Sequence, residues 1–410
     1  MVHDTIVCLL AGGAGERLYP LTRDRAKPAV PFGGAYRIVD ITLSNCVNSD
    51  LRRIFVVTQY KALSLNRHLR EGWNIVANEL GEFVQVLPPM KRVGESWYQG
   101  TADAIYQNLY SIGSEPCKHV LVLSGDHVYK MDYQLMLQHH KDAGADVTVG
   151  TIEIDRSEAS RFGVVEVDSE GRITGWQEKP ANPKPSSPHN PDKCYVSMGI
   201  YCFNQDLLIE AALADAEDPD STHDFGRDVI PKLIGSRRVC SYNFVDENKK
   251  EAQYWRDIGA IDAYYEANMD LVSVSPIFNL YDKDWPLRTY QRQYPPAKFV
   301  FAQEGRRIGM AVDSIVCMGS IISGGRVNRS ILSFDVRVNS YSEVEDSIIF
   351  PHVQIGRHCH IRRAIIDRHV RLPENTEIGY NLEEDRKKYH VTESGIVVVV
   401  PEQRLYEEPE

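Results

Sequence analysis

The stretch CLLAGGAGERLYPLTRDRAKP, Cys8–Pro28, indicates the fold of the N-terminal part of the chain. An apolar run from Ile6 onward reads as a buried strand, and glycines follow it at once. Glycines in that place let the backbone approach a bulky ligand and direct N–H groups toward it. The spacing is neither that of a P-loop nor that of the dinucleotide fingerprint. Because Arg17 and Lys27 follow, the stretch predicts a phosphate site in an α/β domain.

The composition is that of an ordinary globular chain of 410 residues, which is long enough for two domains. A formal net charge of −11 argues against a nucleic-acid or membrane-surface binder, so a local cluster of cations must hold any anionic ligand. The sequence has no apolar run of membrane-spanning length and no signal-peptide layout, and its 8 cysteines contain no C-x-x-C pair. A cytoplasmic protein with reduced thiols is expected.

Apolar strands alternate with helical stretches over the first part of the chain. Strands are expected at Arg53–Thr58, His119–Leu123 and Asp146–Gly150, with helices near Lys61–Arg70, after Gly100 and over Asp132–Ala143. Such strands predict a mostly parallel sheet covered on both faces, with ligands beyond its carboxyl ends. The glycine turn after Leu10 and the pair Gly125-Asp126 after Leu123 fall at such ends, so both are expected in one crevice.

Two irregular stretches divide the chain. Pro180–Pro191 is rich in proline and is expected to be a surface loop, and Ser275–Lys298 reads as a connector. We therefore expect a catalytic domain over residues 1–275, a linker over 276–298 and a second domain over 299–410.

The second domain contains an internal repeat, with aliphatic residues recurring at steps of 6, 6 and 5 over about residues 313–380. These positions are Ile315, Ile321, Val327, Leu332, Val338, Val344, Ile349, Ile355, Ile361, Ile366, Leu372 and Ile378. A small residue stands two positions before nearly every one, which places both on the same face of a short strand. Three such faces per coil of 17 residues predict a triangular parallel β-helix.

Two aspartates on separate segments are candidate metal ligands. Asp126 follows a buried strand, and Asp257 lies in the stretch YWRDIG. Mg²⁺ takes few protein oxygens and completes its shell with phosphate and water, so such a pair suits it. Either aspartate alone is more often a cap or a turn residue, and the pair gains weight only from the glycine loop.

Further polar positions are weaker candidates when taken singly. Lys179 precedes the proline-rich loop and by itself reads as a surface lysine, while Ser197 offers a hydroxyl for a sugar or a phosphate. Tyr98 could provide an aromatic surface beside a helix N-terminus, or could simply belong to the core.

Seven motifs together resemble those of bacterial ADP-glucose pyrophosphorylases, also called glucose-1-phosphate adenylyltransferases. They are LAGGAGERLYPLTRDRAKPAV, WYQGTADAI, SGDHVYKMDY, GWQEKPA, SMGIY, HDFGRDVIP and YWRDIGAIDAYYEAN, and the resemblance covers nearly the whole chain. It implies a Rossmann-like nucleotidyltransferase domain with a mostly parallel sheet, followed by a left-handed parallel β-helix, in a homotetramer. The implied reaction converts ATP and α-D-glucose 1-phosphate to ADP-glucose and diphosphate with Mg²⁺, as the committed step of bacterial glycogen synthesis under allosteric control.

The resemblance also implies roles for individual residues. Arg17 and Lys27 would be catalytic, and Asp126 and Asp257 would be both catalytic and metal-binding. Nucleotide binding would fall to Leu10, Ala11, Gly12, Gly13, Gly15, Gly100, Thr101 and Gly125. Glucose 1-phosphate would be bound by Tyr98, Gly163, Glu178, Lys179 and Ser197, with Lys179 on its phosphate.

The chain departs from the family pattern at its expected effector site. Many members carry a lysine just before RAKP and a histidine shortly after it, where this chain has Asp24 and Pro31. The family's effector arginines are matched by Arg37 and Arg368. Because Asp24 reverses a charge, we expect altered or weak activation by small anions, and a large response to fructose 1,6-bisphosphate would contradict this.

Three alternatives remain open at this stage. The same chemistry could act on UTP or dTTP with glucose, or on GTP with mannose. Acyl transfer by the β-helix, with a histidine as base, is disfavoured because no long loop interrupts the coils; its candidates are His352, His358, His360 and His369. A non-catalytic regulatory subunit would have lost site residues, and this chain keeps them.

Overall fold

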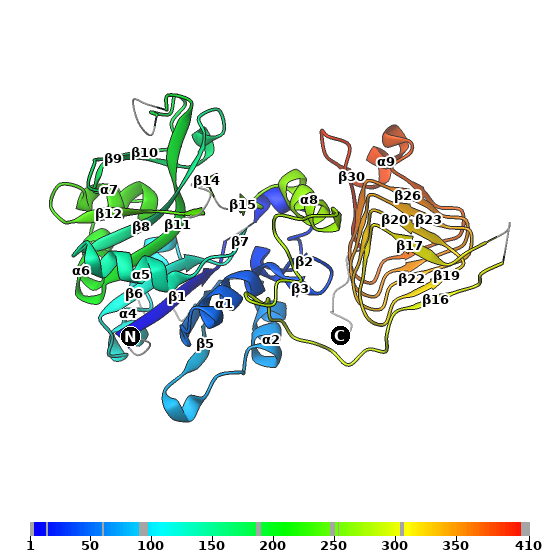
Figure 1. The fold of residues 1–410 in the computed structure, drawn as a ribbon, viewed down its shortest axis with the longest axis horizontal. Coiled ribbons are helices and arrows are strands. Elements are labelled where there is room, and N and C mark those ends of the chain that lie inside the picture. Colours follow the sequence, from blue (N-terminus) through cyan, green and yellow to red (C-terminus); the bar gives the residue numbers. More distant parts are fainter. Residues whose placement is uncertain are drawn as a thin grey trace.

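The computed structural model describes residues 4–13, 15–59, 61–89, 97–185, 190–246, 251–252, 254–303 and 307–402 (Figure 1). An α/β domain and a prism of stacked short strands lie side by side in it. Within these residues, no helix is long and apolar enough to cross a membrane.

The N-terminal domain is built on a nine-stranded sheet in which β6, β1, β4 and β5 pair in parallel. The strands are β1 (Thr5–Ala11), β4 (Arg53–Thr58), β5 (Phe83–Leu87), β6 (His119–Ser124), β8 (Val147–Asp155), β9 (Gly163–Val167), β10 (Ile173–Glu178), β11 (Lys193–Asn204) and β12 (Val239–Asn243). The predicted mostly parallel sheet is confirmed. One strand not foreseen, β11, runs antiparallel between β6 and β8.

Helices cover both faces of this sheet, as the continuous apolar strands predict. They are α1 (Ile38–Asn48), α2 (Leu63–Gly72), α3 (Thr101–Tyr106), α4 (Leu109–Ser114), α5 (Tyr133–Asp142), α6 (Gln205–Ala216), α7 (Ile230–Leu233) and α8 (Ile261–Met269). Along β1 the side chains alternate between two cores: Val7 and Leu9 pack with α1, α2 and α5, whereas Ile6 and Cys8 pack with α3 and α6. Because β6, β1, β4 and β5 run parallel, their carboxyl ends lie at the same edge of the sheet.

The C-terminal part is a parallel β-helix with three sheets. One contains β16 (Lys298–Val300), β19 (Ile321–Ser323), β22 (Arg337–Val338), β25 (Gln354–Ile355) and β28 (Arg371–Leu372). The second contains β17 (Met310–Val312), β20 (Arg326–Asn328), β23 (Glu343–Glu345), β26 (His360–Arg362) and β29 (Glu377–Ile378). The third contains β18 (Ile315–Val316), β21 (Ile331–Leu332), β24 (Ile348–Ile349), β27 (Ala364–Ile366), β31 (Val397–Val399) and β30 (His390–Val391), and α9 (Leu382–Lys388) follows β29.

The predicted register of the repeat is wrong in the first coil and correct afterwards. Leu332 pairs with Val316 and Val338 with Ile322, one residue closer in the chain than the regular spacing. Val316 and Ile322 therefore take the inward positions assigned to Ile315 and Ile321. The reason is physical: adjacent aliphatic pairs leave the sequence ambiguous, and only pairing with the next coil decides which residue turns inward.

The outer residues of the third sheet join the two domains. Ile331, Ile348 and Ile365 pack with α8 and with residues around Leu18 and Phe32 in one apolar core. A buried ion pair lies in the same junction, where Arg25 Nη2 is 2.8 Å from each carboxylate oxygen of Asp367. The connector expected over Ser275–Lys298 contains no helix and no strand before β16, and all of it is described.

Loss of one inward aliphatic residue is expected to destabilise the β-helix. Ile355 is fully buried, so Ile355→Ala removes apolar contacts and leaves a cavity that should cost about 2–5 kcal/mol. A urea titration followed by circular dichroism should show an earlier transition. The adjacent exposed residue supplies a matched control, Gln354→Ala, which should leave the transition unchanged.

Candidate active site

A glycine loop follows β1 at the carboxyl edge of the sheet. Gly13 and Gly15 have φ values of +111° and +61°, a region that other residues rarely adopt. A Cβ at Gly15 would also lie 2.9 Å from Thr22 Cγ2. The N–H of Gly13 donates to Gln59 Oε1 at 3.1 Å, so the side chain of Gln59 supports the loop. Gly13 and Gly15 thus present backbone without side chains at this edge of the sheet.

The ends of β1 and β6 meet at this loop. Leu10 is in register with Ser124, and Gly125 N–H donates to Leu10 O at 3.0 Å. A Cβ at Gly125 would lie 3.2 Å from that same oxygen, which leaves little room for a side chain. Asp126 comes next in the chain and therefore lies beside the glycine loop.

A short two-stranded pairing brings the second aspartate to the same place. Strand β15 (Trp255–Asp257) pairs antiparallel with β7 (His127–Tyr129), and Asp257 is in register with His127. Lys27 Nζ lies 2.7 Å from Asp126 Oδ2 and 3.5 Å from Asp257 Oδ1. One ammonium group therefore bridges the two carboxylates.

Arg17 reaches this cluster from the other side of the glycine loop. Its Nη2 is 3.8 Å from Asp257 Oδ2, and its side chain is largely exposed. A Cβ at Gly259 would lie 2.6 Å from Arg17 Nη2, so glycine there leaves space for the guanidinium. An exposed cation next to a glycine loop is free to turn toward a phosphate.

The electrostatics of the cluster keep Asp126 ionised. Burial alone would raise its pKa, but the Lys27 ammonium, His127 and a hydrogen bond donated by Ser124 hold the pKa well below its usual range. Two carboxylates with only oxygen donors fit a hard divalent cation such as Mg²⁺. The residues present therefore suit the metal that the sequence predicts.

A pocket of about 550 Å³ opens beside α3. Its walls consist of polar and charged residues, namely Gln99, Gly100, Glu178, Lys179, Thr222, Asp224 and Arg227. Lys179 has a φ of +44° and an exposed side chain, and its Nζ is 3.0 Å from Glu178 Oε1.

Close packing around this pocket accounts for two of the predicted glycines. A Cβ at Gly163 would lie 2.6 Å from Trp176 Cζ2 and 3.0 Å from Glu178 Oε2. A Cβ at Gly100 would lie 2.2 Å from His223 O, while Thr101 Oγ1 donates to Asp224 Oδ2 at 3.1 Å. Gly100 and Thr101 thus fix the pocket wall.

Tyr98 and Ser197 do not line this pocket. The phenol oxygen of Tyr98 accepts from Asn108 Nδ2 at 2.9 Å, and burial raises the pKa of that phenol. Ser197 Oγ accepts from Gly199 N–H at 3.2 Å. A Cβ at Gly199 would come within 3.8 Å of the His127 ring, so this segment lies near the carboxylate cluster.

The two predicted effector residues, Arg37 and Arg368, line one pocket between the domains. Further cationic or aromatic residues surround it, among them Arg25, Arg292, Tyr294, Phe334, His352 and His369. Pro31 belongs to its wall, whereas Asp24 lies outside and pairs with Arg23, with Asp24 Oδ2 2.9 Å from Arg23 Nε. The reversed charge of Asp24 is thus offset by its neighbour.

The histidines weighed as an acyl-transfer base have other surroundings. His352 and His369 stack with ring centroids 4.8 Å apart, and His358 stacks on Tyr341. His360 Nδ1 is 3.7 Å from Glu343 Oε2, and its side chain is exposed. His352 and His369 therefore lie together at the pocket between the domains, whereas His358 and His360 have other neighbours.

Several residues at these sites were not foreseen. Gln59 also donates from Nε2 to Tyr98 O at 3.1 Å and so joins the glycine loop to the segment before α3. Arg227, Gly259 and Arg25 each contact or line a site as well. Arg25, Arg227 and Gly259 each lie inside one of the motifs that carry the family resemblance, which is the signal that could have found them, whereas Gln59 lies in none of those motifs.

Comparison with known proteins agrees with this geometry. Residues 6–274 match the nucleotidyl transferase family, and residues 295–399 match the GlmU-like C-terminal hexapeptide family, whose repeat forms a left-handed β-helix. The glucose-1-phosphate adenylyltransferase of Koribacter versatilis is 65% identical over 99% of this chain and 97% of its own length. Those of Rhodopirellula baltica and Methylococcus capsulatus are 56% and 52% identical, covering 97% and 99% of this chain and 90% and 96% of their own. The chain belongs to the glucose-1-phosphate adenylyltransferase family of nucleotidyl transferases.

Proposed function

We propose that this chain transfers the adenylyl group of ATP to α-D-glucose 1-phosphate, which yields ADP-glucose and diphosphate. The observation that carries the proposal is the convergence of Arg17, Lys27, Asp126 and Asp257 at the glycine loop. The family relationship supports the same reaction.

The chemical problem is to bring two anions together. Two unit charges about 4 Å apart repel by roughly 4 kcal/mol at an effective dielectric constant of about 20. A phosphate oxygen of the sugar attacks the α-phosphorus, the bond from this phosphorus to the bridging oxygen breaks, and diphosphate leaves with the electron pair. Positioning and cancellation of charge are sufficient for this displacement, so no protein nucleophile is needed.

Each residue has a role in that displacement. The glycine loop and Arg17 hold the triphosphate, and Lys27 stabilises the charge that develops on the phosphates. Lys179 holds the phosphate of the sugar, with Glu178 beside it. Asp126 and Asp257 would hold Mg²⁺, which would supply positive charge to offset the charge that develops on the phosphates.

A substrate panel tests this proposal. Diphosphate release from the purified chain should be fastest with ATP and glucose 1-phosphate among combinations of ATP, UTP, dTTP and GTP with glucose and mannose 1-phosphates. Preference for another pair would replace the proposed substrates, and absence of turnover with every pair would favour a regulatory subunit.

Regulation is a second part of the proposal. We infer that small anionic effectors bind the pocket between the domains, because Arg37 and Arg368 both line it. The buried Arg25 supports this, since its Nε and Nη1 have no hydrogen-bond partner among the described residues. The homotetramer and the cytoplasmic location remain predictions from the sequence.

Removal of Arg368 is expected to weaken the response to anions without loss of basal turnover. In Arg368→Ala, the concentration of fructose 1,6-bisphosphate or inorganic phosphate that gives half of the effect should rise about tenfold or more, because a charge-assisted contact contributes about 1.5–3 kcal/mol. Arg371→Ala, at an exposed arginine in β28, is the matched control. Equal responses of both variants would contradict the assignment.

A further inference from the structure

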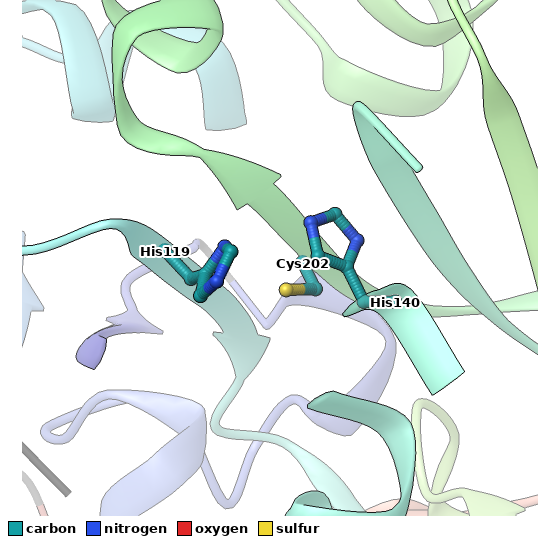
Figure 2. A group of neighbouring side chains, drawn as sticks. All are labelled: His119, His140 and Cys202. Carbon is teal, nitrogen blue, oxygen red and sulfur yellow. The ribbon is translucent and has the colours of Figure 1, made fainter. Parts of the chain in front are cut away.

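Three metal-ligating side chains converge at the edge of the sheet opposite to the glycine loop. His119 begins β6, Cys202 lies in β11 and His140 lies in α5, which packs on this face (Figure 2). One ligand atom from each lies within 4.8 Å of the other two. None of the three takes part in the proposed transfer.

The sheet register explains the convergence. Asn204 pairs with His119 and Cys202 with Leu121, so His119 and Cys202 are diagonal neighbours on one face of the ladder. Thr148 of β8 pairs with Cys202 on the other side. Because α5 packs on this face of the sheet, His140 lies close to both His119 and Cys202.

All three side chains are buried, and one nitrogen of His119 lacks a hydrogen-bond partner among the described residues. Cys202 and His140 are 0% and 1% exposed, and His119 is 9% exposed. Nδ1 of His119 is buried and has no hydrogen-bond partner within the described part of the chain. A buried imidazole nitrogen without a partner has lost its hydration without compensation, which makes it a site for a ligand.

Burial favours the neutral form of both histidines. Burial lowers the pKa of His119 and lowers that of His140 to about 4. A neutral imidazole keeps a nitrogen lone pair, which is the form that binds metal ions.

We propose that His119, His140 and Cys202 bind a Zn²⁺-type metal ion, with water in the fourth position. Two imidazole nitrogens and one sulfur are a donor set that favours such an ion over Mg²⁺. Tetrahedral Zn²⁺ separates these ligands by about 3.4–3.6 Å, so side-chain movements of about 1 Å complete the site. On binding, the Sγ–metal bond forms as the thiol proton leaves to solvent.

Hydrogen bonds already orient one of the ligands. His140 Nδ1 is 2.8 Å from Thr148 Oγ1, and its Nε2 is 3.2 Å from Asn204 Oδ1. To bind the metal, one nitrogen would exchange its present hydrogen bond for the metal bond while the other keeps its partner, an arrangement that fixes the ring of a metal ligand.

Access is available beside the cluster. A pocket of about 450 Å³ is lined by Cys117, Lys118 and Asn204, among other residues, and Asn204 contacts His140. The metal would join β6, β11 and α5 at the end of β6 remote from Asp126. We infer a structural role, because a strand of this length separates the site from the transfer chemistry by about 17 Å.

Cobalt binding to the full chain tests the proposal. With Mg²⁺ in excess, wild-type protein should bind one equivalent of Co²⁺ with an intense thiolate charge-transfer band, which carboxylate sites do not produce. Cys202→Ser should abolish the band. Cys117→Ser removes the thiol in the nearby pocket wall and should retain it.

A second variant keeps the proposal testable if Cys202→Ser fails to fold. His119→Asn alters the least buried ligand, and a competition assay with a chromophoric chelator should show its Zn²⁺ affinity lowered at least tenfold. Both variants should keep wild-type adenylyl transfer, which reports an intact fold. Absence of the band in wild-type protein, its survival in Cys202→Ser, or unchanged Zn²⁺ affinity in His119→Asn would overturn the proposal.

Discussion

We expect Asp126→Asn to lower kcat by about 10³-fold, which corresponds to about 4 kcal/mol of transition-state stabilisation. The reason is local. Asp126 is held ionised beside Lys27, and asparagine of the same shape would remove the negative charge that attracts a divalent cation. Steady-state diphosphate release at saturating ATP and glucose 1-phosphate measures the effect.

Two comparisons separate a catalytic loss from a folding defect. Asp142→Asn makes the same chemical change at an exposed position near the end of α5 and should leave kcat unchanged. The thermal midpoint of Asp126→Asn should stay close to that of wild-type protein. Near-normal turnover in the Asp126 variant would remove this residue from the metal role.

The sequence predicts those parts of the fold in which the spacing of apolar residues along the chain matches the spacing of buried positions in the structure. Continuous apolar strands such as β4 and β6 require two covered faces, and the spacing of six, six and five residues requires three-sided coils. The antiparallel insertion of β11 could not be predicted, because strand order depends on contacts between distant segments. The same holds for the shorter first coil, where Ile321 and Ile322 are equally apolar.

In the candidate site, too, local pattern predicts some positions, whereas contacts between distant segments decide others. The glycine loop and Asp126 lie directly after buried strands, so their position at the carboxyl edge follows from local pattern. Asp257 reaches them only through the pairing of β15 with β7, and Gln59 only through a hydrogen bond to Gly13. Neither contact leaves a periodic trace in the sequence, so Asp257 could be named only as a candidate metal ligand, and the family resemblance added its catalytic role.

We expect Lys179→Ala to raise the KM for glucose 1-phosphate by about 10- to 150-fold, with a smaller effect on kcat. A hydrogen bond to a charged group contributes about 1.5–3 kcal/mol, and this amine is the proposed partner of the sugar phosphate. Initial rates at varied glucose 1-phosphate and fixed ATP give the two constants separately.

A comparison with Lys184 shows whether the rise in KM is specific to Lys179 or follows from the loss of any positive charge in this loop. Lys184, in the same loop, pairs with Glu166 and is also exposed, so Lys184→Ala removes an equal charge without reaching the pocket walls. Arg227 does line the pocket and could partly replace the lost cation. The double variant Lys179→Ala/Arg227→Ala should therefore raise KM further than either single change. If Lys179→Ala and Lys184→Ala have the same KM as wild-type protein, Lys179 is a surface lysine and the sugar phosphate lies elsewhere.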